Sequence, residues 1–299
     1  MRTPNYLQKG DKVVILSTAR KIQKIEIDFA IQLLESWGLQ VELGKSIGPE
    51  EHQFAGSDEL RLKDLQQALN DQSIKAIFCA RGGYGTVRIL DRLEWTQFMD
   101  SPKWLVGYSD ITYLHNWLQD KLGVESLHAT MPAFFEKDTD AALTSIKDVL
   151  FGNSVSYEFE PHQLNRVGTA NGELIGGNLS IIYSILGTNS RFITDGRILY
   201  LEDLDEYLYH IDRMMMALKR AGKLKNLAGL VIGGMNAMND NAIPFGKTAV
   251  EIIAEHVEEY NYPIAYNLPA GHVADNRSLI FGRTATLQVE KAQSKLLFE

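Results

Sequence analysis

The amino-acid sequence predicts an α/β fold: an N-terminal, mainly parallel sheet flanked by helices, of the flavodoxin-like type, followed by a second, smaller α/β domain. Short apolar or β-branched runs such as 13–16 alternate with longer amphipathic segments, which is the pattern of βαβ units. Two of these runs, 74–79 and 105–106, end in glycine-containing turns. The alternation weakens in the second half, which therefore predicts a separate domain.

The elements of the first half follow from periodicity. Apolar residues at helical spacing predict a helix from residue 25 to about 38. A second helix is expected over 60–69, with Ser57 as its N-cap and acidic residues in its first turn. The expected strands are 13–16, 41–43, 74–79 and 105–106.

The second half mixes strands and helices. Residues 151–168 show little periodicity, so we expect an N-terminal domain at 1–152, a linker at 153–170 and a C-terminal domain at 171–299. Beyond the linker, a helix is expected after Asn178, and the further expected elements are strands at 198–201, 230–232, 279–281 and 285–289 and helices over 207–221 and 248–257.

Composition excludes several classes of protein. The chain has 299 residues, 45% of them hydrophobic and 23% charged, which is typical of a globular protein with a sizeable core. A net charge of -8 disfavours a nucleic-acid partner, because phosphate binding depends on Lys and Arg. No stretch approaches the roughly 18 apolar residues of a membrane helix, so no membrane partner is expected. The single cysteine, Cys79, is expected to be a buried thiol, and a reducing, cytoplasmic location fits.

The sequence contains no complete nucleotide-binding or metal-binding motif. The stretch beginning Gly83-Tyr84-Gly85 has Arg88 where a dinucleotide fingerprint needs its third glycine. The Gly-Lys-Thr at 246–248 lacks the earlier glycine of a P-loop, since Asn241 stands there. The seven histidines are scattered and form no His-Glu-x-x-His motif, so neither a metal site nor a cofactor is expected.

The turn after the fourth strand offers a candidate nucleophile. Ser109 stands in a sharp Gly-Tyr-Ser-Asp turn at the end of a buried strand, where its hydroxyl would project from the sheet edge. The amide of Asp110, at the expected start of the next helix, would be one oxyanion donor, and an amide of Gly82 or Gly83 the second. The sequence does not distinguish between the two glycines.

A base and an acid are also available. His272 lies in an irregular segment after Pro269, and Glu202 ends the apolar run 198–201. A carboxylate at the end of a buried strand needs a partner such as a histidine N–H. The order serine, acid, histidine matches the α/β-hydrolases, but their nucleophile turn needs a glycine where Ile111 stands. That superfamily is therefore not predicted.

The order and spacing of several short motifs resemble the LD-carboxypeptidase family of serine peptidases, over almost the whole chain. The motifs are 54–58 with Arg61 and Asp64, 81–85, 107–110, 176–179, 201–203 with Glu206, 211–213, and 271–272.

The resemblance implies residue roles and an activity. The family's nucleophile falls on Ser109, its acid on Glu202, with Glu206 as the competing candidate, and its base on His272. It also implies two domains with the triad completed across their interface, a homodimer, and no metal or cofactor. The implied reaction removes the terminal D-alanine from a cytoplasmic murein tetrapeptide during peptidoglycan recycling.

A carboxypeptidase must bind a free carboxylate, and Arg81 or Arg213 would supply a bidentate clamp, with Tyr84 as a further substrate-binding candidate. Two other functions stay open. One is a microcin-immunity-type hydrolase that cleaves an amide of peptide-nucleotide antibiotics, and the other is a non-catalytic protein that binds ligands in its cleft.

Overall fold

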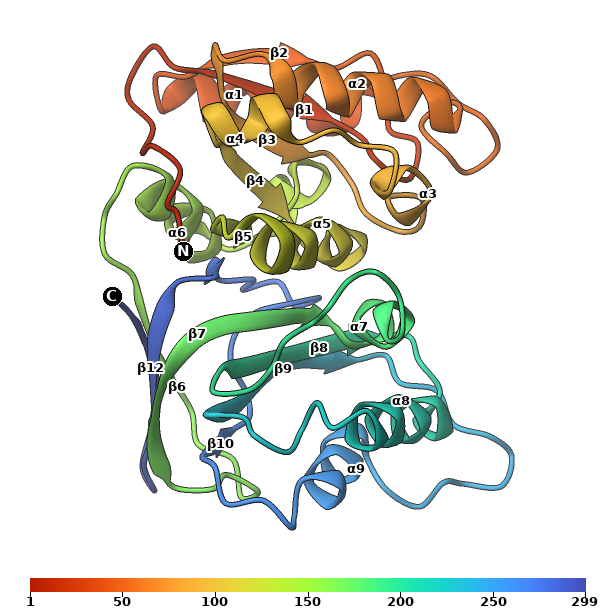
Figure 1. The fold of residues 1–299 in the computed structure, drawn as a ribbon, viewed down its shortest axis with the longest axis vertical. Coiled ribbons are helices and arrows are strands. Elements are labelled where there is room, and N and C mark those ends of the chain that lie inside the picture. Colours follow the sequence, from red (N-terminus) through yellow and green to blue (C-terminus); the bar gives the residue numbers. More distant parts are fainter. The chain divides into compact units, whose positions relative to one another are not determined.

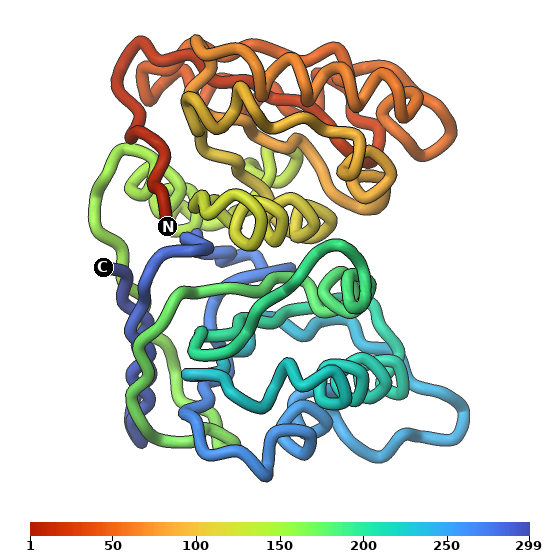
Figure 2. The backbone as a smooth tube through the Cα atoms, viewed as in Figure 1, coloured from red at the N-terminus to blue at the C-terminus, as the bar shows by residue number.

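The computed structural model describes residues 1–299, and the chain divides into two compact units. The first unit contains Met1–Asn153 and Ala274–Ile280, and the second contains Ser154–Val273 and Phe281–Glu299. Figure 2 follows the chain by colour through both units. The expected C-terminal domain at 171–299 therefore includes a short returning segment, 274–280, that belongs to the first unit.

The sheet of the first unit has six strands in the order β11-β5-β4-β3-β1-β2. Neighbouring pairs from β2 to β5 are parallel, and their order, 2-1-3-4-5, is that of flavodoxin-like sheets. The predicted fold class is thus confirmed. The strands are β1 (Lys12–Leu16), β2 (Gln40–Leu43), β3 (Ile74–Cys79), β4 (Trp104–Gly107), β5 (Ser126–His128) and β11 (Leu279–Phe281).

Helices connect these strands (Figure 1). The Ser57 side chain accepts a hydrogen bond from the Leu60 amide at 3.2 Å, which confirms the predicted N-cap. The helices are α1 (Asp28–Ser36), α2 (Asp58–Asn70), α3 (Val87–Leu90), α4 (Thr96–Asp100), α5 (Thr112–Trp117) and α6 (Asp140–Leu150), with short turns η1 (Lys24–Ile27), η2 (Ser109–Ile111), η3 (Leu118–Leu122) and η4 (Pro132–Lys137).

Apart from the half-buried Lys12 and Lys75, the residues of the central strands β1, β3 and β4 are buried, which explains why they are mostly apolar. Cys79 at the end of β3 is fully buried, as expected. Burial raises the pKa of its thiol to about 12, so it is not a reactive thiolate.

The second unit contains a seven-stranded mixed sheet in the order β10-β9-β8-β7-β12-β13-β6. The pairs from β7 to β10 are parallel, and β12, β13 and β6 continue the sheet in antiparallel pairs. Figure 1 shows β7 as a long, curved strand. The elements are β6 (Ser156–Phe159), β7 (Gly168–Asn178), α7 (Leu179–Ile185), β8 (Ile198–Leu204), α8 (Leu208–Arg220), β9 (Gly229–Asn236), α9 (Ala249–His256), β10 (Ile264–Ala265), β12 (Thr284–Val289) and β13 (Ser294–Phe298).

None of these helices combines the length and the apolar character that spanning a membrane requires.

Candidate active site

Ser109 occupies a strained turn at the carboxyl end of β4. Its φ of 63° lies in the left-handed region, which a residue other than glycine adopts at a cost of about 1–3 kcal/mol and which is concentrated at functional sites. The residue is half-buried and begins the turn η2 that leads into α5. Ser109 thus lies where the end of β4 turns toward the following helix.

Gly107 makes this turn possible. Its φ is 159°, and a Cβ there would lie 2.9 Å from Cγ1 of Ile111 and 3.2 Å from Cβ of Cys79. A larger residue at this position would therefore push the turn that carries Ser109 away from β3.

The loop 81–85, called the glycine loop below, lies beside Ser109. A Cβ on Gly82 would be 3.3 Å from Ser109 Oγ and 3.2 Å from Ser109 Cβ, so a larger residue there would require the serine or the loop to shift. The amides of Gly82 and Gly83 donate no hydrogen bond within the chain. Of the two, Gly82 lies against the serine, whereas a Cβ on Gly83 would meet the side chain of Arg20.

A buried arginine holds this loop against β1. Arg61, on α2, is fully buried and donates to the carbonyl oxygen of Thr18 at 2.6 Å and to that of Gly85 at 3.0 Å. Its guanidinium also pairs with Asp58 and lies 5.0 Å from the ring centroid of Phe54. Arg61 therefore links α2 both to Thr18, after β1, and to Gly85 in the loop 81–85.

The side chain of Asp110, directly after Ser109, has a structural role. Its Oδ2 accepts a hydrogen bond from the Thr86 amide at 2.9 Å. This bond joins the turn at Ser109 to the residue that follows the loop 81–85. Burial raises the pKa of this carboxyl to about 6, against the hydrogen bonds from Thr86 and the charge of Arg61.

His115, on α5, contacts the backbone at the start of the turn that carries Ser109. Its Nε2 lies 2.8 Å from the Gly107 carbonyl oxygen, and its Nδ1 lies 2.8 Å from Ser126 Oγ. Because a carbonyl only accepts, Nε2 carries the hydrogen and Nδ1 accepts from the serine. Burial lowers the pKa of the ring to about 4, so the imidazole is neutral. Sequence reasoning missed this histidine, since apolar neighbours on a helix give no sign of its role.

In the second unit, Glu202 and His272 form a close pair. Oε2 of Glu202 lies 2.7 Å from Nδ1 of His272 and 3.3 Å from its backbone nitrogen. The Glu202 side chain is completely buried, and that of His272 is 15% exposed. Burial opposes protonation of the ring, but the charge and hydrogen bond of Glu202, with a contribution from Asp203, outweigh it and raise the pKa of His272 above 6.5.

Local backbone features hold this pair in place. Gly271 has a φ of 100°, and a Cβ there would lie 2.8 Å from Cβ, Cγ and Oε2 of Glu202. The Asn236 amide group, at the end of β9, donates to the His272 carbonyl oxygen at 2.6 Å. Residue 271 therefore has a steric reason to be glycine, because its backbone passes directly against the side chain of Glu202.

Asp203 anchors the end of β8 to the neighbouring helix. Its carboxyl accepts from Asn178 Nδ2 and from the Ser180 amide, each at 2.9 Å. Asn178 in turn caps α7 by accepting the Ile181 amide at 3.2 Å. Burial, followed by the charge of Glu202, raises the pKa of Asp203 to about 7.

Other predicted residues have different partners. Glu206, the competing acid, has Oε2 at 2.6 Å from Nδ1 of His210, one turn along the chain. Arg213 lies over the ring of Tyr209, 5.2 Å from its centroid.

In the first unit, Arg81 pairs with Glu26 at 3.4 Å. The Tyr84 side chain is 46% exposed, and its ring lies 6.1 Å from that of Phe54.

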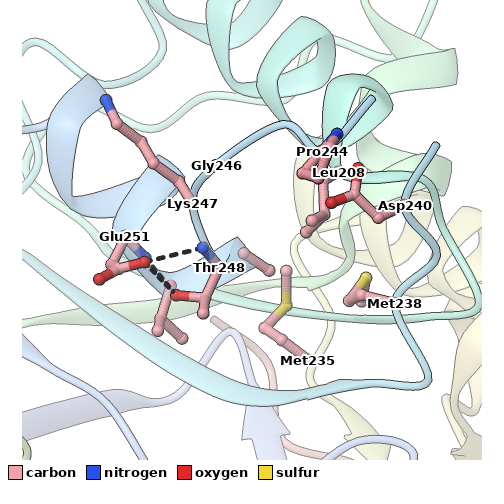
Figure 3. Close-up of a pocket in the computed structure, with 11 residues that line it drawn as sticks. Leu208, Met235, Met238, Asp240, Pro244, Gly246, Lys247, Thr248 and Glu251 are labelled. Atoms are coloured by element: carbon pink, nitrogen blue, oxygen red, sulfur yellow. Dashed lines mark hydrogen bonds between the residues drawn. The ribbon is translucent and has the colours of Figure 1, made fainter. Parts of the chain in front are cut away.

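A cavity of about 550 Å³ opens in the second unit beside the carboxyl end of β9 (Figure 3). Met235 and Met238 line its apolar side, and the start of α9 lines the other, where Thr248 and Glu251 form a capping box. Met235 is the register partner of Asp203, so the cavity lies next to the strand that carries Glu202.

The structure thus brings Gly82 to Ser109 in the first unit and Glu202 to His272 in the second. No group of three or more His, Cys, Asp or Glu side chains is placed to hold a metal ion.

Comparison with known families covers both units. The model described as the LD-carboxypeptidase N-terminal domain matches residues 13–129, and the model described as the LD-carboxypeptidase C-terminal domain matches residues 171–287.

Curated relatives match along nearly the whole chain. A probable murein peptide carboxypeptidase of Bacillus subtilis is 33% identical over 298 residues, covering 95% of this chain and 91% of the relative. The murein tetrapeptide carboxypeptidase of Pseudomonas aeruginosa is 28% identical, covering 93% of each chain.

Solved structures share the fold. The muramoyltetrapeptide carboxypeptidase of Oxalobacter formigenes superposes with a TM-score of 0.85 at 24% identity, covering 96% of this chain and 98% of that one. The microcin C7 self immunity protein MccF superposes with a TM-score of 0.88 at 18% identity, covering 99% of this chain and 98% of that one.

Proposed function

Because the chain belongs to the LD-carboxypeptidase family and is thereby a serine-type carboxypeptidase acting on peptides, we propose that it removes the terminal D-alanine from murein tetrapeptides with Ser109, His272 and Glu202 as its catalytic triad. The single observation that carries this proposal is the 2.7 Å contact between Glu202 Oε2 and His272 Nδ1. A carboxylate only accepts, so Nδ1 carries the hydrogen and Nε2 is left to take a proton from a serine.

The proposed first step is attack on the scissile carbonyl. Nε2 of His272 takes the proton of Ser109, and Oγ bonds to the carbonyl carbon of the diamino acid. The oxyanion is stabilised by the Asp110 amide and by an amide of the glycine loop. Gly82 is the better candidate there, because its own backbone lies against the Ser109 side chain.

In the proposed second half, the imidazolium gives its proton to the nitrogen of D-alanine, which leaves, and an acyl-enzyme remains on Ser109. A water molecule, deprotonated by His272, then attacks the ester carbonyl, and the imidazolium returns the proton to Ser109 Oγ as the tripeptide acid is released. Glu202 stays ionised and stabilises the imidazolium in both halves. A place for this reaction in cytoplasmic peptidoglycan recycling, and a homodimer, remain predictions from the sequence.

A competing function is the cleavage of peptide-nucleotide amides. The structural neighbour MccF is described in complex with aspartyl sulfamoyl adenosine, and its likeness to this chain, at 18% identity, shows the fold alone. The higher identity to a probable murein peptide carboxypeptidase favours the murein reaction.

The deciding experiment offers the purified protein three substrates: murein tetrapeptide ending in D-alanine, its isomer ending in L-alanine, and aspartyl sulfamoyl adenosine. We expect release of D-alanine alone, measured by mass spectrometry. Cleavage of the nucleotide conjugate alone would assign the chain to the competing function, and cleavage of none would reject both.

A further inference from the structure

Arg20 lies four residues after the end of β1, at the same sheet edge as the candidate nucleophile. In the first sheet β1 neighbours β3, and β3 neighbours β4, all parallel. Their carboxyl ends lead respectively to Arg20, to the loop 81–85 and to Ser109. Side chains at adjacent carboxyl ends of a parallel sheet converge on one ligand site.

The glycine loop is shaped to receive the Arg20 side chain. A Cβ on Gly83 would lie 2.2 Å from Cδ and 2.5 Å from Cγ of Arg20, and its φ is 105°. The Arg20 backbone also meets the loop, since its amide donates to the Gly82 carbonyl oxygen at 3.4 Å. The arginine stem therefore lies across Gly83 in the space that any larger residue would fill.

Arg20 is the cation near this loop that has no partner. Arg81 pairs with Glu26 at 3.4 Å, and Arg88 pairs with Asp58 at 2.7 Å. Lys21, the next residue along the chain, pairs with Glu50 at 2.6 Å. Arg20 is exposed and forms no ion pair or side-chain hydrogen bond within the chain. A free guanidinium in a protein of net charge -8 is a ready site for an anionic group.

The distances suit the end of a peptide. A scissile carbonyl carbon sits about 3 Å from the attacking oxygen, and the terminal carboxylate carbon lies one residue further on, about 4 Å away. The loop residue next to Ser109 is Gly82, and the Arg20 stem lies on the following residue, Gly83. The Arg20 stem thus lies one loop residue beyond the glycine next to Ser109, a separation comparable to that between a scissile carbonyl and the terminal carboxylate.

We propose that Arg20 binds the free C-terminal carboxylate of the substrate and so makes the enzyme a carboxypeptidase. The inference rests on the proposed function, and it replaces Arg81 and Arg213 in that role. The planar guanidinium and the carboxylate match in a bidentate pair, which a peptide continuing beyond the cleavage site cannot form.

The turnover test compares Arg20→Gln with the wild type on the tetrapeptide and on its C-terminal amide. Glutamine keeps the stem that packs on Gly83 and removes the charge. We expect kcat/KM for the free acid to fall about 10- to 100-fold, as for the loss of a charged hydrogen bond, with no change for the amide. Arg88→Gln is the matched control, because it removes an equal charge nearby, and it should keep the wild-type preference for the acid.

A binding test does not depend on turnover. Backbone amide signals of Gly82 and Gly83 are followed by NMR while N-acetyl-D-alanine or N-acetyl-D-alanine amide is added. In the wild type the acid should shift these signals saturably and more than the amide does, and in Arg20→Gln the difference should vanish.

The two tests separate the claims. A wild type that releases no D-alanine rejects the proposed function, and the NMR comparison still decides the role of Arg20. Equal shifts in wild type and Arg20→Gln, no shift in the wild type, or a preference for the acid that only Arg81→Gln abolishes would each overturn the inference.

Discussion

Oε2 of Glu202 lies 2.7 Å from Nδ1 of His272, with the carboxylate fully buried and the ring largely so. The contact determines the tautomer of the ring, with the hydrogen on Nδ1, so Nε2 is the nitrogen that can accept a proton. Both side chains belong to the second unit, whereas Ser109 belongs to the first. The proposed chemistry therefore requires residues from both units.

Ser109→Ala should lower turnover by about 10⁴-fold or more, because no other hydroxyl would form the acyl-enzyme. D-alanine release measured by mass spectrometry gives the rate, and thermal unfolding shows whether the variant folds normally. A folded variant that keeps wild-type turnover would falsify the nucleophile assignment.

The pH dependence of kcat/KM should report His272. A protonated ring cannot take the serine proton, so activity falls as the pH drops through its pKa, which is raised above 6.5. The acid limb should therefore lie above pH 6.5. Glu202→Gln removes the negative charge that stabilises the imidazolium, so the His272 pKa should move down, measured by NMR in the Ser109→Ala background. An unchanged His272 pKa in that double variant would contradict the pairing.

Gly271→Ala should damage the Glu202–His272 pair. The new methyl group would lie 2.8 Å from three atoms of Glu202, and the residue would keep a φ of 100°. We expect a loss of stability of about 1–3 kcal/mol from backbone strain, and in addition a fall in turnover of at least about 100-fold from the displaced carboxylate.

Gly222→Ala is the matched control for this change. Gly222 also has a positive φ, 72°, but a Cβ there meets nothing within 4 Å. It should lose stability without losing turnover per folded molecule, measured by urea unfolding beside the kinetic assay. If both variants kept full activity, the close approach of Gly271 to Glu202 would have no catalytic importance.

Arg61→Met should destabilise the first unit by roughly 2–4 kcal/mol, since it leaves buried carbonyl groups of Thr18 and Gly85 without their donor. Arg88→Met alters the same Asp58 carboxylate from an exposed position and should cost less than about 1 kcal/mol. Denaturant midpoints measure both. Equal losses would mean that the guanidinium of Arg61 does not hold the glycine loop.

Several features of the protein follow from the sequence alone. Apolar runs such as 76–79 predict central strands because a strand that is buried on both faces has few positions for polar side chains. The Gly-Tyr-Ser-Asp turn after β4 predicts a serine at the carboxyl end of that strand because a strand-to-helix turn restricts the local backbone. These are short-range effects, and local pattern is enough to read them.

Other features depend on contacts between distant segments. The 11-residue strand β7 was not predicted, since its glycine, asparagine and threonine residues have little strand pattern, and its pairing with β8 and β12 decides its conformation. Likewise only the folded chain shows that Glu202 contacts His272 while Glu206 contacts His210, because both glutamates have the same local chemistry.

The free guanidinium of Arg20 also depends on contacts between distant segments. Its sequence neighbours say nothing of Gly83, which lies more than sixty positions along the chain and reaches it only because β1 and β3 are adjacent. Local periodicity and turn chemistry therefore determined the central strands of the first sheet and the turn at Ser109. The tertiary structure decided which charges are paired and which stay free, because that depends on packing across the sheet.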